Sequence, residues 1–163
     1  MQAQTVYVLV GLPGSGKSTW LKARGANAIS SDALRVLLID DETHQGIHRT
    51  VFRTVRYLLR QRLELGRPHT YIDATNLIPK DRRPYVVIAQ LYNARVEAVY
   101  FDVPLDVCRQ RNAGRSRVVP EEALDMLAAK LIPPTEDEGF DAVQRISIEP
   151  TPSAEPQPRG EWV

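Results

Sequence analysis

The sequence predicts one α/β domain in which helices cover both faces of a mostly parallel, five-stranded sheet, giving three layers. The length of 163 residues is about what a single hydrophobic core supports. Short apolar segments rich in β-branched and aromatic residues alternate along the chain with segments of helical periodicity. Because crossover helices join parallel strands, this alternation is typical of a parallel sheet with helices on both sides.

Each predicted strand is an apolar run bounded by turn residues, and the five runs are Thr5–Val10, Ala28–Ser30, Thr70–Asp73, Val96–Asp102 and Val143–Ile148. The predicted helices between them are Lys17–Ala23, Ala33–Leu38, Ile47–Leu65, Asp81–Tyr92, Leu105–Arg111 and Glu121–Leu131. These elements place the domain at residues 1–148.

The longest predicted helix, Ile47–Leu65, is amphipathic, and Gly66 is expected to end it. Its polar face carries four arginines at intervals of four, three and four residues, namely Arg49, Arg53, Arg56 and Arg60. Such a stripe is typical of a solvated helix face. A track for a nucleic-acid backbone is the alternative interpretation.

Composition points to a soluble globular protein, with 43% hydrophobic and 25% charged residues. The sequence has neither the run of about 20 apolar residues that crosses a bilayer nor the pattern of a signal peptide. Cys108 is the single cysteine. We therefore expect a cytoplasmic protein without membrane contact. Residues 149–163 contain four of the 12 prolines and are predicted to form a tail that could contact a protein partner.

Positive charge is concentrated in the middle of the chain, although the net charge is only +1. Residues 47–117 contain 13 Arg and 1 Lys against 6 acidic residues. Guanidinium groups match the geometry of phosphate oxygens. The distribution therefore indicates an anionic ligand.

A phosphate-binding motif, Gly11-Leu12-Pro13-Gly14-Ser15-Gly16-Lys17-Ser18, follows the first predicted strand and leads into a helix. It matches GxxxxGK[ST], the P-loop or Walker A motif, in which glycines let backbone N–H groups converge on phosphates. We expect Lys17 to reach the β- and γ-phosphates of ATP and Ser18 to ligate Mg²⁺. The expected nucleotide-binding residues are Gly11, Pro13, Gly14, Ser15, Gly16, Lys17, Ser18 and Thr19.

Two acidic residues lie at the carboxyl ends of the second and third predicted strands, where ligands bind in open parallel sheets. Asp32 either caps the helix behind it or accepts the proton of an acceptor hydroxyl, with Arg35 three residues later on the acceptor's phosphate. Asp73 occupies a Walker B position, where it would bind Mg²⁺ or hold the loop geometry. It lacks the following Glu of many water-activating ATPases, which disfavours hydrolysis as the main reaction. Asn76 fits a turn residue.

Residues 108–120 contain four arginines around Gly and Ser and predict a mobile basic loop. Such a loop could close as a lid over a triphosphate, or it could be an ordinary solvated loop. In the lid interpretation, Arg109 or Arg111 would stack on adenine, and Arg115 or Arg117 would contact phosphate.

The segments GLPGSGKST, SSDALR, IDATNL and RQRNAGRSRVVPEE together resemble the P-loop kinase module of the polynucleotide 5′-kinase family, over roughly residues 5–131. The resemblance implies an adenylate-kinase-like sheet and phosphorylation of a 5′-hydroxyl end of DNA or RNA by ATP, as in nucleic-acid repair. It also implies a general base at Asp32, a site acid at Asp73, an acceptor contact at Arg35 and a lid arginine at Arg115, with Arg117 as its substitute.

Two other functions remain open on the sequence. Small bacterial kinases with the same motifs act on metabolites, antibiotics, sugars or aminoacyl-tRNA, so the acceptor could be a small molecule or a nucleotide sugar. The chain could also be an ATP-binding switch with little catalysis. Only three Phe and two Trp are present, which argues against an aromatic platform for bases.

Overall fold

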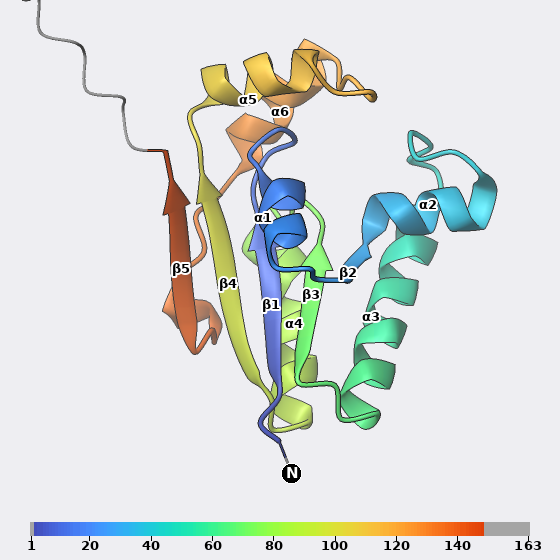
Figure 1. The fold of residues 1–163 in the computed structure, drawn as a ribbon, viewed down its shortest axis with the longest axis vertical. Helices are drawn as coiled ribbons and strands as arrows, with labels where there is room; N and C mark the ends of the chain where they lie inside the picture. Colours follow the sequence, from blue (N-terminus) through green and yellow to red (C-terminus); the bar gives the residue numbers. More distant parts are fainter. Residues whose placement is uncertain (1, 149–163) are drawn as a thin grey trace, which may run out of the picture.

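The computed structural model describes residues 2–148 and confirms the α/β fold (Figure 1). The five strands are β1 (Thr5–Val10), β2 (Ala28–Ser30), β3 (His69–Asp73), β4 (Arg95–Asp102) and β5 (Ala142–Ser147). They form one sheet in the order β2-β3-β1-β4-β5. All four strand pairings are parallel, so the carboxyl ends of the strands meet at one edge.

Helices cover both faces of this sheet, as the three-layer prediction requires. The helices are α1 (Lys17–Ala23), α2 (Ser31–Ile39), α3 (His48–Glu64), α4 (Pro79–Leu91), α5 (Leu105–Ala113) and α6 (Glu121–Lys130), and a short 3₁₀ helix, η1, spans Glu136–Glu138. One hydrophobic cluster joins α3 and α4 to the sheet, and a second joins α1, α5 and α6 to its other face.

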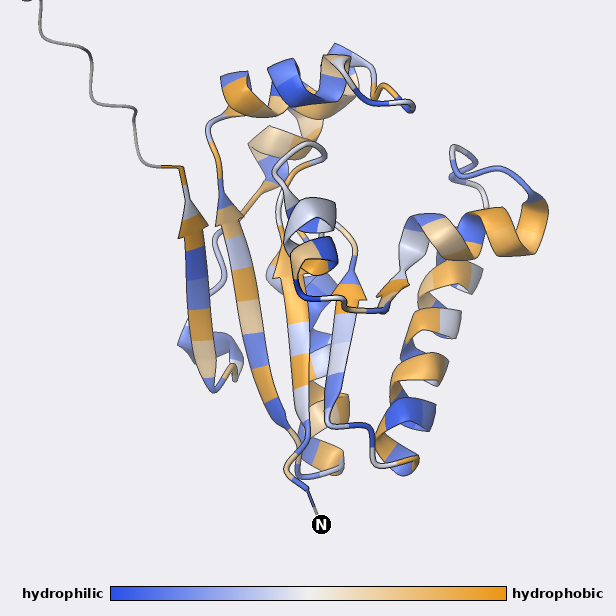
Figure 2. Cartoon of the chain, in the orientation of Figure 1, coloured by the Kyte–Doolittle hydropathy of each residue, from blue (hydrophilic) through white to orange (hydrophobic). Residues whose placement is uncertain are grey.

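Alternation along the central strand explains why two clusters form. Val6, Val8 and Val10 of β1 belong to the cluster with α3 and α4, whereas Leu9 belongs to the cluster with α1, α5 and α6. Because both faces of β1 are covered, the strand is nearly continuously apolar, and Figure 2 shows hydrophobic bands predominating along it. Within residues 2–148, every helix is too short or too polar to span a bilayer.

The predicted helices agree with the structure except at their ends. α3 ends at Glu64, and Gly66 follows in the left-handed region at φ +68°. α2 begins at Ser31, and its N-cap is Ser30, whose Oγ accepts a hydrogen bond of 3.2 Å from the Ala33 N–H. The interpretation of Asp32 as the cap of this helix is therefore wrong.

The predicted mobile loop at residues 108–120 is also corrected in its first half. α5 continues to Ala113, because Cys108 and Asn112 are buried on its inner side. The loop proper begins at Gly114, and the side chain of Asn112 closes its base through two hydrogen bonds with the backbone of Val119, at 2.7 and 2.9 Å. The predicted Pro-rich tail lies outside the described residues.

Candidate active site

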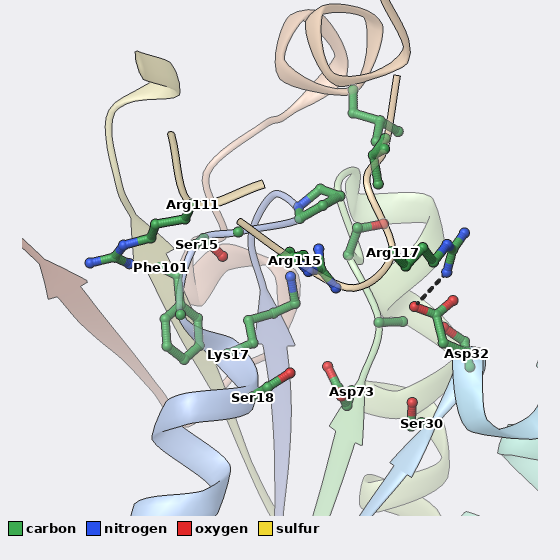
Figure 3. A pocket seen from close by; sticks show the side chains of 18 of the residues that line it. Ser15, Lys17, Ser18, Ser30, Asp32, Asp73, Phe101, Arg111, Arg115 and Arg117 are labelled. Atoms are coloured by element: carbon green, nitrogen blue, oxygen red, sulfur yellow. Dashed lines mark ion pairs between the residues drawn. The ribbon is translucent and has the colours of Figure 1, made fainter. Parts of the chain in front are cut away.

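An open cavity of about 1430 Å³ lies at the carboxyl edge of the sheet. Its walls come from the P-loop, the ends of β2 and β3, the connection from α2 to α3, and the segment from α5 to α6. Figure 3 shows the side chains of Lys17, Ser18, Asp32, Asp73, Arg115 and Arg117 gathered around it. The predicted site residues line this cavity except Gly11, which is buried, and Arg109.

Three glycines of the P-loop are required by close approaches and by backbone conformation. Gly14 and Gly16 have φ values of +80° and +98°. A Cβ on Gly14 would lie 2.7 Å from the carbonyl oxygen of Cys108, and one on Gly11 would lie 2.6 Å from Ser15 Oγ. Ser15 Oγ is buried and has no hydrogen-bond partner within the described part of the chain. An unsatisfied hydroxyl in a cradle that excludes Cβ atoms fits a phosphate ligand.

Lys17 stands at the start of α1, and its ammonium donates hydrogen bonds to the carbonyl oxygens of Gly11 and Leu12 at 2.8 and 2.9 Å. The pKa of this ammonium is lowered to about 8, mainly by burial and also by the nearby charge of Arg115, whereas the Asp73 carboxylate opposes the shift. An anionic phosphate beside Lys17 would stabilise the charged ammonium.

Asp73, at the end of β3, and Ser18, at the start of α1, are the predicted Mg²⁺ ligands. Burial raises the pKa of the Asp73 carboxyl, and Lys17 opposes that shift. Residues 2–148 contain no group of three or more His, Cys, Asp or Glu that could hold a metal ion. One hydroxyl and one carboxylate suit Mg²⁺, which binds oxygen ligands and keeps water and substrate phosphates in its other positions.

Opposite the P-loop, Asp32 is held between two arginines. Arg35 Nη1 lies 3.2 Å from Asp32 Oδ1, and Arg117 Nη1 lies 3.1 Å from Asp32 Oδ2. Figure 3 shows the second ion pair reaching from the lid loop to α2. Arg35 is almost fully buried, and Arg117 also lies 3.9 Å from Glu42. The structure thus places Arg117, predicted as a nucleotide contact, beside the predicted acceptor residues.

The other three arginines of residues 108–120 lie in different surroundings. Arg115 is close enough to lower the pKa of Lys17, and Figure 3 shows it next to that lysine. The guanidinium of Arg111 lies 3.2 Å from the position that a Cβ on Gly16 would take. Arg109 pairs with Asp125 of α6 and with Asp106, and it does not line the cavity. Arg111 is therefore better placed than Arg109 to contact a nucleotide.

A buried network behind the P-loop was not predicted from the sequence. Asn76 has φ +48°, and its amide donates a hydrogen bond of 2.7 Å to the carbonyl oxygen of Leu9 in β1. Arg82 of α4 is fully buried and donates to the carbonyl oxygens of Asn76 and Ile132, at 2.9 and 3.0 Å, and to both carboxylate oxygens of Glu138. Asn76 was expected only as a turn residue, but its hydrogen bonds also connect β1 to Arg82 of α4.

Two ring-bearing residues of α3, His48 and Phe52, also line the cavity. The rings of His48 and Phe52 have centroids 4.5 Å apart and planes inclined by 43°. The sequence placed Phe52 on the apolar face of its helix. No sequence signal distinguished it from the core residues on that face.

Comparisons with known proteins identify the family and the fold. The model of the AAA domain family (AAA_33) matches residues 6–134. A bifunctional polynucleotide phosphatase/kinase from Schizosaccharomyces pombe is 23% identical over 150 residues, covering 88% of this chain and 33% of the relative. An L-seryl-tRNA(Sec) kinase from Methanococcus maripaludis is 24% identical over 136 residues, covering 79% and 53%. The chain thus spans between a third and about half the length of these curated relatives.

Solved structures share the fold over nearly their whole length. A candidate kinase from Chloroflexus aurantiacus aligns with a TM-score of 0.70 and 14% identity, covering 90% of this chain and 89% of its own. The APS kinase CysC from Mycobacterium tuberculosis, in complex with AMPPNP and APS, aligns with a TM-score of 0.58 and 19% identity, covering 92% and 91%. At these identities the likeness establishes the P-loop kinase fold.

Proposed function

The chain belongs to the AAA domain family of P-loop kinases, and we propose that residues 1–148 transfer the γ-phosphate of MgATP to the 5′-hydroxyl end of DNA or RNA. The observation that carries the proposal is the placement of Asp32. It lines the same cavity as Lys17, in the first turn of α2 after β2, with a buried guanidinium on its carboxylate. This arrangement provides a place for a hydroxyl acceptor opposite the phosphate donor.

The P-loop side would hold the donor. Backbone N–H groups of the loop and Lys17 would bind the β- and γ-phosphates, and Ser18 and Asp73 would hold Mg²⁺. When bound, Mg²⁺ neutralises the charge that develops on the phosphate oxygens. Arg115 and Arg111 of the lid add positive charge over the P-loop, where the same oxygens would lie.

On the acceptor side, Asp32 would accept a hydrogen bond from the hydroxyl and take its proton during transfer. The bond from the γ-phosphorus to the bridging oxygen of ADP breaks, and a bond from that phosphorus to the acceptor oxygen forms. A carboxylate is a weak base for an alcohol, but a loose transition state requires orientation of the nucleophile more than early removal of its proton. Arg35 fixes the carboxylate at 3.2 Å.

Three features support a nucleic-acid acceptor. The four residues to which the resemblance assigns roles, Asp32, Arg35, Asp73 and Arg115, all line one cavity, and a curated relative is a polynucleotide phosphatase/kinase. The acceptor wall also includes the aromatic pair of His48 and Phe52. A second candidate is a kinase of aminoacyl-tRNA or of a small molecule, which the L-seryl-tRNA(Sec) kinase and the APS kinase favour as relatives of similar fold.

The test is transfer from labelled ATP, with Mg²⁺, to a panel of acceptors. The panel contains 5′-hydroxyl DNA, 5′-hydroxyl RNA, seryl-tRNA and adenosine phosphosulfate, and the same oligonucleotides with a 5′-phosphate serve as matched controls. We expect one phosphate to be added to the 5′-hydroxyl oligonucleotides only. Label on seryl-tRNA or adenosine phosphosulfate alone would replace the proposal with the second candidate, and intact ATP with every acceptor would favour a switch.

The Asp32→Asn variant tests the residue that carries the proposal. The amide keeps the shape of the side chain but cannot take the proton, so we expect kcat to fall by about 10²- to 10⁴-fold. The Kd of MgATP should stay within about threefold, because Asp32 lies across the cavity from the P-loop. A large loss of MgATP binding in this variant would instead show that Asp32 has a structural role.

A further inference from the structure

The acceptor wall of the cavity is built from segments that the P-loop does not use. The connection between α2 and α3 contributes Thr43 and Gln45, and the first turns of α3 contribute His48 and Phe52. Gln45 accepts a hydrogen bond of 3.5 Å from Arg35, which ties this connection to the residue beside Asp32. The wall therefore adjoins the predicted base for the acceptor hydroxyl.

His48 and Phe52 stand four residues apart, which places their side chains next to each other on one side of α3. Phe52 is half-buried and packs at the border of the core cluster, whereas His48 is exposed. The pair thus offers partly exposed aromatic surface inside a cavity that otherwise serves charged phosphates. A flat ring is the ligand group that such a surface binds best, since stacking of a base on aromatic side chains is worth about 1–3 kcal/mol.

Two guanidinium groups line the same cavity as this aromatic pair. Arg35 and Arg117 both contact Asp32, and Arg117 also lies 3.9 Å from Glu42. Arg35 is almost fully buried, and its Nε has no hydrogen-bond partner among the described residues. A buried guanidinium with an unsatisfied N–H is costly, and an anionic ligand group beside it would reduce that cost.

From this juxtaposition we propose that His48 and Phe52 bind the base of the terminal acceptor nucleotide, and that Arg117 joins Arg35, for which the sequence already suggests an acceptor-phosphate contact, on the phosphate at the 3′ side of that nucleotide. This inference rests on the proposed function and adds to it the residues that recognise the base. Arg117 becomes an acceptor-binding residue, and a sugar or a free alcohol lacks the groups that the pocket contacts.

Matched acceptors test the aromatic contact. The probe is a dinucleotide with a 5′-hydroxyl, compared with the same molecule whose terminal ribose carries hydrogen in place of the base. For Phe52→Leu we expect the KM of the complete dinucleotide to rise about fivefold to a hundredfold, with the KM of the abasic analogue, kcat and the KM of MgATP unchanged. His48→Ala, at an exposed position, should shift KM in the same direction by less.

Tyr57→Leu provides the control, because Tyr57 is an exposed aromatic residue of the same helix that does not line the cavity. We expect it to leave all these constants unchanged. Equal losses for complete and abasic acceptors in Phe52→Leu, or no loss for either, would overturn the aromatic platform. The KM of MgATP reports in the same variant whether the fold is intact.

A second pair of acceptors tests the phosphate contact. It also distinguishes a polynucleotide end from a free nucleotide as the ligand. Arg117→Met should raise the KM of a nucleoside 3′-monophosphate at least tenfold while leaving that of the plain nucleoside within twofold, since only the former carries the anion. A KM that improves from the mononucleotide to a longer oligonucleotide would identify a polynucleotide end as the ligand. Equal KM values would identify the free nucleotide.

Binding of a dinucleotide that lacks the 5′-hydroxyl distinguishes failure of this inference from failure of the proposed function. Base-dependent binding that Phe52→Leu abolishes, without phosphorylation of any 5′-hydroxyl acceptor, would support the pocket and overturn the kinase assignment. If the unaltered protein phosphorylates 5′-hydroxyl acceptors but Phe52→Leu does not change base-dependent binding, the kinase assignment would stand and the pocket would be overturned.

Discussion

The two sides of the cavity are built in different ways. The donor side is one continuous segment, residues 11–19, which would bind phosphates mostly through backbone N–H groups, and its glycines are closely packed. The acceptor side combines side chains from α2, the lid and α3, which lie far apart in the sequence: Asp32, Arg35, His48, Phe52 and Arg117. A general donor can therefore be bound by one local motif, whereas the choice of acceptor depends on tertiary structure.

The two sides also differ in what holds them in place. Behind the donor side, the fully buried Arg82 joins Asn76, Ile132 and Glu138, and Asn76 in turn is bonded to β1. On the acceptor side, the ion pair between Arg117 and Asp32 is partly exposed to solvent. The donor side should thus stay rigid when the acceptor side is altered.

The largest expected effect is on stability, from Arg82→Met. Removing one partner of a buried ion pair typically costs about 3–5 kcal/mol, and here two backbone carbonyl oxygens also lose their donor. Arg117→Met is the matched control on the acceptor side, where loss of a partly exposed pair should cost at most about 1 kcal/mol. Urea unfolding of both variants measures the difference. Similar urea midpoints for the two variants would contradict the view that the donor side is rigid and the acceptor side adaptable.

A smaller effect, in kinetics, is expected from Lys17→Met. Removing one positioned donor from the transferring phosphate costs about 10²- to 10³-fold in kcat. The Kd of MgATP should rise as well, because Lys17 belongs to the donor side, while binding of an acceptor dinucleotide should stay unchanged. Asp32→Asn is expected to leave MgATP binding nearly unchanged. Titration of both ligands against both variants would show whether the sides act independently, and a Lys17→Met variant that loses acceptor binding would contradict this.

The donor side could be predicted from the sequence because its signals are local. The P-loop motif, the strand before it and the helix after it occupy adjacent positions, and the structure has β1 and α1 at the predicted residues. The order of apolar segments also predicted the parallel sheet. The same reasoning predicted that Asp32 and Asp73 lie at the carboxyl edge of the sheet, since Asp73 ends β3 and Asp32 comes two residues after β2.

The acceptor side could be predicted only in part because contacts between distant segments leave no pattern in the sequence. Arg117 and Arg115 are only two positions apart in one basic run. In the loop closed by Asn112, however, Arg117 contacts Asp32, whereas Arg115 lies near Lys17. Phe52 shares the apolar periodicity of α3 with its core neighbours, and only the approach of α2 and the lid makes it part of a cavity. In the sequence, Arg82 likewise cannot be distinguished from the exposed charged residues of a helix, although it is fully buried.

The smallest expected effect is a pH dependence confined to the donor side. The Lys17 ammonium has a pKa of about 8 in the free protein, below its usual 10.5, and bound phosphates would raise it. The Kd of MgATP should therefore be nearly constant below pH 8 and rise by up to about tenfold per pH unit above it, as a proton must be taken up on binding.

Stability should change in the opposite direction over the same range, which separates this effect from general alkaline damage. Between pH 8 and about 10.5 the unfolded chain binds more protons at Lys17 than the folded protein does, so this group makes the free energy of unfolding rise with pH. Lys17→Met should lack both slopes, and acceptor binding should show neither. If the MgATP affinity of Lys17→Met fell above pH 8 as steeply as that of the unaltered protein, another group would be responsible, and the separation of the two sides would have to be drawn elsewhere.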